Sequence, residues 1–416
     1  MEQLLQKGVV IPNPQSVQIG NEVVLDGISG DGVVIYGGCR IFGEKTLIMP
    51  GVKLGHEGPV TVEDCQIGPD VELKGGFFRR SAFLEKANMG SGAHVRDGSI
   101  LEEQANGAHA VGLKHTILFP FVTLGSLINF CDCLMAGGTS RKNHSEVGSS
   151  YIHFNYTPNQ DKATPSLIGD VPRGVMLNQP PIFLGGQGGL VGPVRIEYGT
   201  VIAAGVVYRK DVLEGGKLLL GHRPIERDPN YYPALYWYVK EPVVNNTNYI
   251  ANLIALKRWY LDVRSQFFKG DVMSQMLYEG VLEKLDMAVK ERIDRFKALS
   301  QKMPESAKKY RAVMKDEASE NLLKQEQEFF ERWQEIEDMV YVNQDNSGDA
   351  AIREPFLEEL GRHIKERGSD YVAVIQELDA SCSAKGTEWL QSIVDGINQQ
   401  VLQLIPSFMD VGATYG

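Results

Sequence analysis

Small and apolar residues recur in pairs at a six-residue step in the first half of the chain. The longest run keeps this step from Ser81 to Leu101, and shorter runs lie between residues 17 and 73. The pairs of the longest run are Ser81/Phe83, Ala87/Met89, Ala93/Val95 and Ser99/Leu101. Turn-forming residues often follow a pair, as in the segment IGPD at 67–70. Each hexad therefore predicts one short strand and one corner of a coil, and stacked coils bury their aliphatic side chains inside.

An ordinary β-sandwich or β-barrel is the alternative architecture for this half of the chain. Strands in such folds follow one another irregularly, at a spacing of about 8–12 residues. The regular step between Ser81 and Leu101 favours a parallel β-helix instead. The step does not determine the hand of the helix.

The period changes to that of amphipathic helices after Tyr249. One apolar stripe runs from Ile250 to Phe268, and a second runs from Leu277 to Leu299. Further helical patterns cover about residues 306–342, 354–367 and 387–405. We therefore expect several long helices that pack against one another.

These two periodicities divide the chain into parts. We expect a β-helix domain over residues 1–224, a connector rich in proline and aromatic residues over 225–248, and an all-α helical domain over 249–416. A chain of 416 residues is long enough to form two cores. The helical part shows no catalytic motif, so its role cannot be predicted from sequence.

Composition limits the possible functions. The 53 acidic and 42 basic side chains give a formal net charge of −11, which argues against a general nucleic-acid surface or an anionic-membrane surface. The five cysteines form neither a disulfide framework nor a zinc-binding CxxC pair, and we expect no metal site. The N-terminus lacks the pattern of a secretory signal. Together these features predict a cytoplasmic protein without a nucleic-acid or membrane partner.

Candidate chemistry is concentrated between residues 129 and 204. Side chains suited to binding or proton transfer follow one another there along a tightly wound coil: Arg141, Lys142, His144, His153, Asn155, Tyr156 and Lys162. Because successive coils lie close together, these side chains could share a pocket. Lys114 and His115 could line a phosphate site, although a solvated lysine is the simpler interpretation.

Several segments within residues 7–224 resemble the acetyltransferase half of the bacterial bifunctional enzymes that acetylate glucosamine-1-phosphate and uridylylate the product. The matching segments are GVVIPNPQSVQIG near the start, EDCQIGPDVEL at 63–73, NF at 129–130, KNH at 142–144, NY at 155–156, SLIGD at 166–170 and GPVRIEYGTVIAAG at 192–205. The resemblance implies a left-handed parallel β-helix, acetyl-CoA as the acyl donor and a homotrimer.

The resemblance also implies roles for one histidine and two lysines. His144 would be the general base that takes a proton from the substrate amine, because imidazole titrates near neutral pH. His153 is the alternative base. Lys162 and Lys142 would hold phosphate oxygens. A structural role for His144, with its ring bonded to the backbone at a corner, is the competing interpretation.

Five further residues take binding roles from the same resemblance. Asn155 and Tyr156 would contact the amino sugar and the acyl donor. Ala203 and Ala204 would let the pantetheine arm lie against the coil, and Arg223 would meet the phosphates of CoA. An asparagine at a corner and a packed tyrosine are the structural alternatives for the first two residues.

The chain departs from the family pattern in three places. Only eleven residues separate His144 from Asn155, Val147 stands where the family has a tyrosine, and the segment 172–189 is longer. A nucleotide-binding opening for uridylyl transfer and a Walker motif are both missing from the sequence. Two functions therefore stay open: an acyl-CoA-dependent acyltransferase acting on an amino-sugar phosphate or sugar nucleotide such as UDP-N-acetylglucosamine, or a noncatalytic module that binds a sugar nucleotide or a partner protein.

Overall fold

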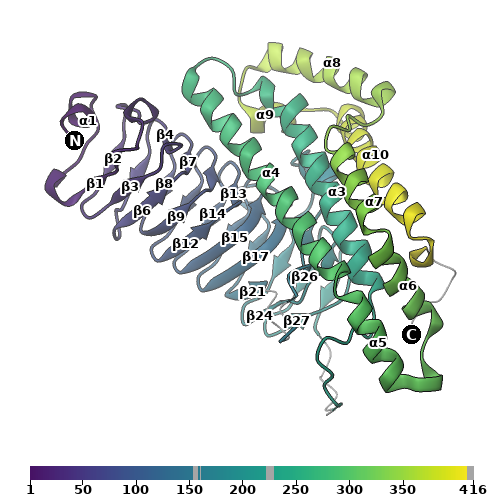
Figure 1. Cartoon of the computed structure of the whole chain (residues 1–416). Helices are drawn as coiled ribbons and strands as arrows, with labels where there is room; N and C mark the ends of the chain where they lie inside the picture. Colours follow the sequence, from purple (N-terminus) through teal and green to yellow (C-terminus); the bar gives the residue numbers. More distant parts are fainter. Residues whose placement is uncertain (153–157, 160, 222–228, 410–416) are drawn as a thin grey trace.

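The first half of the chain is a parallel β-solenoid with three faces (Figure 1). The computed structural model describes residues 1–152, 158–159, 161–221 and 229–409. A short helix, α1 (Glu2–Gln6), precedes the first coil. Most coils then contribute one short strand to each face, and the strands of one face pair in parallel register from coil to coil.

The strands of each face can be followed in chain order. The first face holds β1 (Gln18–Ile19), β3 (Arg40–Phe42), β6 (Val60–Glu63), β9 (Gly76–Arg79), β12 (Ala93–Arg96), β15 (Val111–Leu118), β17 (Ile128–Met135), β21 (Ser150–Ile152), β24 (Gly188–Leu190) and β27 (Val207–Tyr208). The second face holds β4 (Leu47–Ile48), β7 (Gln66–Ile67), β10 (Ala82–Phe83), β13 (Ile100–Leu101), β22 (Ser166–Ile168) and β25 (Val194–Ile196). The third face holds β2 (Val34–Ile35), β5 (Lys53–Leu54), β8 (Glu72–Leu73), β11 (Asn88–Met89), β14 (Asn106–Gly107), β16 (Thr123–Leu124), β20 (Glu146–Val147), β23 (Phe183–Leu184), β26 (Val201–Ile202) and β28 (Leu218–Leu219).

Two long strands turn the corner between the first and second faces. Strand β15 bends at His115 (φ 45°) and β17 bends at Asp132 (φ 59°), both in the left-handed region of the backbone map. The first part of β15 pairs with β12 on the first face, and its last residues pair with β13 on the second face. The bends place both polar side chains on the edge between these two faces.

The interior of the solenoid is built from the pairs that the six-residue step predicted. All eight residues of the run from Ser81 to Leu101 are buried, and one inward ladder continues in register through Val95, Leu113 and Phe130. Burial of such stacked aliphatic and aromatic side chains is the main driving force for this fold. The predicted parallel β-helix is therefore confirmed.

A helical region follows the solenoid and packs against its second face (Figure 1). Its helices are α3 (Lys240–Asp262), α4 (Val272–Ser300), α5 (Met303–Met314), α6 (Glu320–Glu331), α7 (Trp333–Asn343), α8 (Ala350–Arg367), α9 (Tyr371–Gln376) and α10 (Ala380–Leu404). Helix α4 contacts β4, β7 and β10. It approaches so closely that a Cβ atom on Gly280 would lie 2.4 Å from the side chain of Gln66.

The helical region also confirms the second half of the predicted fold. The pattern expected over 306–342 contains three helices, because Ser319 caps a new helix by accepting a hydrogen bond from the backbone N–H of Leu322. Helix α3 begins at Lys240, inside the segment expected to be a connector. The boundaries of independently folding domains stay a prediction. Among the described residues, no helix combines the length and apolar character needed to cross a membrane.

Candidate functional site

The KNH segment lies on a hairpin inserted at the edge between the second and third faces. Strands β18 (Gly138–Ser140) and β19 (Asn143–His144) pair in antiparallel register, unlike the strands of the solenoid. Lys142 is exposed in the turn between them, and His144 is half-buried. The Nδ1 atom of His144 is buried and has no hydrogen-bond partner among the described residues. The competing interpretation, a ring bonded to the backbone, therefore finds no support at this atom.

Two side chains outside the strands hold this hairpin. Nη1 of Arg141 donates to the carbonyl oxygens of Gln104 and Phe121, both at 3.0 Å, and to Oγ1 of Thr123 at 2.8 Å. Nε2 of Gln376, from α9, donates to the carbonyl oxygen of Thr139 at 2.6 Å. The position of the hairpin thus depends on two earlier coils of the solenoid and on the helical region.

Lys162 lies at a different edge, between the first and second faces. Its carbonyl oxygen accepts a hydrogen bond of 3.1 Å from Nη1 of Arg292 on α4. A cavity of about 130 Å³ is lined by Lys162 together with Asp161, Arg295 and Lys302. Nζ of Lys302 lies 2.6 Å from Oδ1 of Asp161. The walls of this cavity therefore carry three cations beside one paired carboxylate.

Ala203 and Ala204 occupy the third edge, between β26 on the third face and β27 on the first face. Ala203 is half-buried and Ala204 is exposed. The coil above comes so near that a Cβ atom on Gly185 would lie 2.4 Å from the backbone nitrogen of Ala204. The small side chains predicted to face the pantetheine arm thus sit in a tightly stacked corner.

The candidate residues of one chain are therefore distributed over all three edges of the solenoid. Lys142 and His144 share a hairpin, but Lys162 and the Ala203–Ala204 corner lie at the other two edges. Four further residues with predicted roles lie outside the described residues: His153, Asn155, Tyr156 and Arg223. One chain does not bring its described candidate residues into one pocket.

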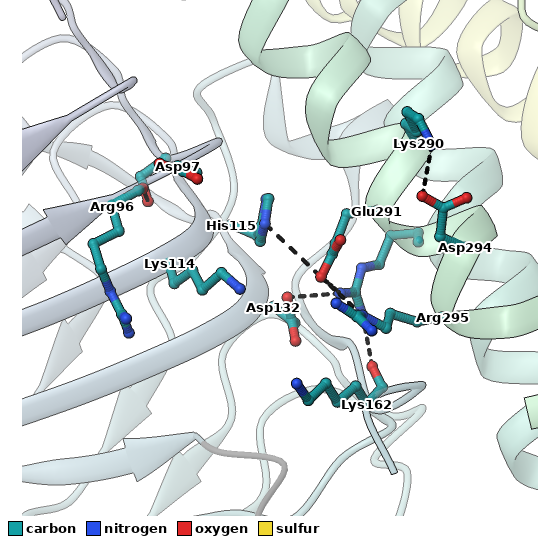
Figure 2. Close-up of polar contacts among 12 residues, drawn as sticks. Arg96, Asp97, Lys114, His115, Asp132, Lys162, Lys290, Glu291, Asp294 and Arg295 are labelled. Carbon is teal, nitrogen blue, oxygen red and sulfur yellow. Dashed lines mark hydrogen bonds and ion pairs between the residues drawn. The ribbon is translucent and has the colours of Figure 1, made fainter. Parts of the chain in front are cut away.

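The structure assembles a different polar cluster at the edge beside α4 (Figure 2). Nη2 of the buried Arg292 lies 2.7 Å from Oδ1 of Asp132. Nε2 of His115 lies 3.9 Å from Oε1 of Glu291, and the same oxygen accepts a hydrogen bond of 2.9 Å from Nε of Arg295. The cluster joins the bends of β15 and β17 to α4.

Burial and charge act in opposite directions on these groups. Burial lowers the pKa of His115 although Glu291 favours its charged form. Burial also raises the pKa of Asp132, in spite of the opposing charge of Arg292. Burial alone would raise the pKa of Glu291, but the hydrogen bond from Arg295 and the charges of His115 and Arg292 hold that pKa below its usual value. The cluster thus favours a neutral His115 beside an ionised Glu291.

Cations extend from this cluster along the first face. Arg96 and Lys114 are neighbours in register on β12 and β15, with Arg96 exposed and Lys114 half-buried. Figure 2 shows the Lys114 side chain reaching toward Asp132, with Lys162 on the neighbouring loop. Arginine and lysine at such spacing can hold phosphate oxygens. This geometry adds Arg96 to the phosphate site that Lys114 and His115 suggested.

Sequence reasoning missed Asp132, Glu291 and Arg292. A signal was present, because Arg292 follows Leu285 and Ala288 at helical spacing and interrupts the apolar stripe of α4. A cation on an apolar stripe needs a buried partner. The identity of that partner, 160 residues earlier in the chain, could not be read from the stripe. No group of three or more metal-ligating side chains occurs within the part of the chain that the structure describes.

The fold is that of a parallel β-solenoid protein that carries an added helical region. Curated proteins similar to the chain are named bifunctional protein GlmU. The protein from Carboxydothermus hydrogenoformans is 26% identical over 227 residues, which cover 55% of this chain and 45% of that protein. Those from Trichlorobacter lovleyi and Thermotoga maritima are 29% identical over 211 residues and 28% identical over 216 residues.

The similarity covers only part of this chain and only part of each relative. The last two matches cover 50% and 51% of this chain but only 40% and 42% of the relatives. The chain therefore spans less than half the length of these relatives. No protein-family model matches the chain. The comparison supports the resemblance drawn from the sequence motifs, namely to the β-helix half of these bifunctional proteins.

Proposed function

We propose that the chain is an acyl-CoA-dependent acyltransferase that acts on an amino-sugar phosphate or a sugar nucleotide. The observation that carries this proposal is the similarity of about half the chain to bifunctional GlmU proteins, combined with a β-solenoid fold. The cations Arg96, Lys114 and Lys162 at one edge support a phosphate-bearing acceptor. The acyl donor would be acetyl-CoA or another acyl-CoA.

The roles of the residues follow from acyl transfer to an amine. The amine nitrogen attacks the thioester carbonyl, a C–N bond forms, the C–S bond breaks and the thiol of CoA leaves. His144 would take the proton that the amine loses and pass it to the departing thiolate. Lys142 and Lys162 would hold phosphate oxygens. Asn155 and Tyr156 would contact the sugar and the donor.

The donor would lie in the remaining corner. Ala203 and Ala204 leave room for a pantetheine arm, and Arg223 would pair with the phosphates of CoA. His144, Lys162 and the Ala203–Ala204 corner lie at three different edges of the same solenoid, so a complete site needs corners from neighbouring subunits. The proposal therefore includes a homotrimer in which neighbouring chains share each site.

Exposed apolar side chains support contact between subunits. Phe183, Val201 and Leu218 are partners in register on the third face and are 38%, 37% and 62% exposed. Tyr151 and Val207 are exposed on the first face. The helical region covers the second face, so these apolar side chains lie on faces that it leaves open.

A screen of acyl transfer tests this function. Acetyl-CoA and longer acyl-CoAs would be incubated with amino-sugar phosphates and sugar nucleotides, and released CoA thiol would be measured. Thiol release that requires both acceptor and enzyme supports the proposal. Folded protein that neither binds any acyl-CoA by calorimetry nor releases thiol would contradict it.

A noncatalytic module that binds a sugar nucleotide or a partner protein is the second candidate. It is favoured by the buried Nδ1 of His144, which has no partner for an orienting hydrogen bond within the described ranges. Binding of a sugar nucleotide without binding of any acyl-CoA would select this candidate.

A further inference from the structure

A second cavity lies where the helical region meets the edge between the second and third faces. It measures about 320 Å³. Leu84, Glu103 and Gln104 line it from the solenoid, and Arg264 and Tyr371 line it from the helical region. Its size is at the lower end for small-molecule sites, which usually occupy roughly 300–1,000 Å³. The cavity therefore suits a single small ring better than an extended cofactor.

Unpaired polar groups belong to two of the residues that line this cavity. Arg264 is 1% exposed, and its Nη2 atom donates to Oε1 of Glu103. Nε and Nη1 of Arg264 and Oε2 of Glu103 have no hydrogen-bond partner among the residues described. The guanidinium carbon of Arg264 lies 3.7 Å from the ring centre of Tyr371. Buried donors and acceptors without partners are costly and uncommon, and here they mark a polar patch in the wall of the cavity.

The charge around the cavity argues against an anionic ligand. Three carboxylates line it, those of Glu85, Glu103 and Asp370, against two cations, Lys86 and Arg264. A phosphate or carboxylate would meet more like charge than opposite charge. A free cation would find two of the three carboxylates already paired, Glu85 with Lys86 and Glu103 with Arg264. An uncharged ligand avoids both costs, and a hydroxyl group can donate and accept at once.

The remaining walls are aromatic and aliphatic. Phe267, Phe268 and Tyr371 contribute rings, and Met49 and Leu277 contribute aliphatic surface. Such walls cover the apolar face of a small ring while a few polar groups orient it. We propose that this cavity is a binding site for an uncharged sugar ring. It lies on the edge that carries the His144 hairpin and is distinct from the cation cluster beside α4.

Two residues that line the cavity also form hydrogen bonds that hold the His144 hairpin. Gln104 and Gln376 line the cavity. The carbonyl oxygen of Gln104 accepts from Arg141, and Nε2 of Gln376 donates to the carbonyl oxygen of Thr139. A sugar in the cavity thus lies against the residues that hold the hairpin in place. The binding itself does not depend on the proposed acyltransferase activity.

Saturation-transfer NMR on the full chain tests the proposal. The probes are the methyl glycosides of glucose and N-acetylglucosamine at millimolar concentration, with adenosine and inorganic phosphate as comparisons. Ser369 and Ala373 line the cavity and are exposed, so Ser369→Trp and Ala373→Trp fill it without disturbing the core. Ala350→Trp adds the same side chain at an exposed position of α8 that does not line the cavity.

We expect saturation transfer to a methyl glycoside in the wild type and in Ala350→Trp, and a loss of at least about tenfold in both filled variants. Persistence of the signal in the filled variants would place sugar binding elsewhere, for example at the acceptor site proposed above, and would overturn the assignment. Absence of transfer to either glycoside would overturn it as well. Transfer to adenosine or displacement by phosphate, without a response to the glycosides, would refute the ligand class.

Discussion

Arg292 of α4 and Asp132 at the bend of β17 form a buried ion pair, with 2.7 Å between Nη2 and Oδ1, although 160 residues separate them in the chain. The pair joins the helical region to the edge of the solenoid where the cations gather. It is one of several buried polar contacts that couple the two halves of the molecule, together with Arg264–Glu103 and Tyr260–Glu102.

Replacing one partner should therefore cost far more than a surface pair does. In Arg292→Met the carboxylate of Asp132 stays buried without a partner, and we expect the free energy of unfolding to fall by roughly 3–5 kcal/mol. The loss should shrink at acidic pH, because a protonated Asp132 needs no cation. Urea unfolding followed by circular dichroism measures both effects.

The matched control lies on the same helix. Lys290 pairs with Asp294 at 2.7 Å, but both side chains are exposed. Lys290→Met should shift the urea midpoint only slightly, since solvent screens an exposed pair. Equal shifts in the two variants would show that Arg292 contributes no more than a surface charge.

The assignment of His144 predicts a kinetic defect without a binding defect. If its imidazole is the general base, His144→Ala should lower turnover by roughly 10²–10⁴-fold and leave acyl-CoA affinity nearly unchanged. Thiol release and calorimetry measure the two quantities. His109, an exposed histidine bonded to Ser126, provides the control substitution His109→Ala.

His153 provides the competing outcome for the same assay. We expect His153→Ala to be mild. Wild-type turnover in His144→Ala together with a selective loss in His153→Ala would transfer the role of base to His153.

The exposed ladder on the third face predicts the oligomeric state. Charges at Phe183 and Leu218 should disfavour burial of this surface, so Phe183→Glu/Leu218→Glu should convert a trimer into monomers and abolish acyl transfer. Val272 is 76% exposed at the start of α4 and supplies the control Val272→Glu. Light scattering decides the point, and a monomeric wild type at micromolar concentration would refute the shared site.

Glu326 of α6 predicts a pH dependence of stability. Burial raises the pKa of its carboxyl to about 7, although Ser306 donates a hydrogen bond to it. The folded state then binds more protons than the unfolded state between about pH 4.5 and pH 7, so this group lowers stability as pH rises through that window. Glu326→Gln keeps an acceptor for Ser306 and should remove this part of the pH dependence.

Urea unfolding at several pH values between about 4.5 and 8 tests that expectation. Glu320→Gln removes an exposed carboxylate from the same helix and controls for the loss of one charge. An identical pH profile in wild type and Glu326→Gln would mean that the folded protein does not hold an extra proton at Glu326.

The sequence by itself determined the solenoid. The repeating pairs from Ser81 to Leu101 are buried as predicted, because each inward side chain stacks on its counterpart one coil away and the pattern repeats locally. The change of period after Tyr249 likewise indicated helices, since an apolar stripe at helical spacing can be recognised within a single segment of sequence. The motif resemblance to the acetyltransferase half of bifunctional proteins is consistent with the comparisons.

Only the tertiary structure decided where the candidate residues lie. His144 and Lys162 are close in the sequence, which suggested that they could share a pocket. In the structure His144 lies at the edge between the second and third faces, whereas Lys162 lies at the edge between the first and second faces. The partners Asp132 and Arg292, and the pair Glu103 and Arg264, are each more than 150 residues apart. Such pairs form only if the helices cover one particular face of the solenoid. Which face they cover depends on packing over the whole contact surface between the helices and the solenoid.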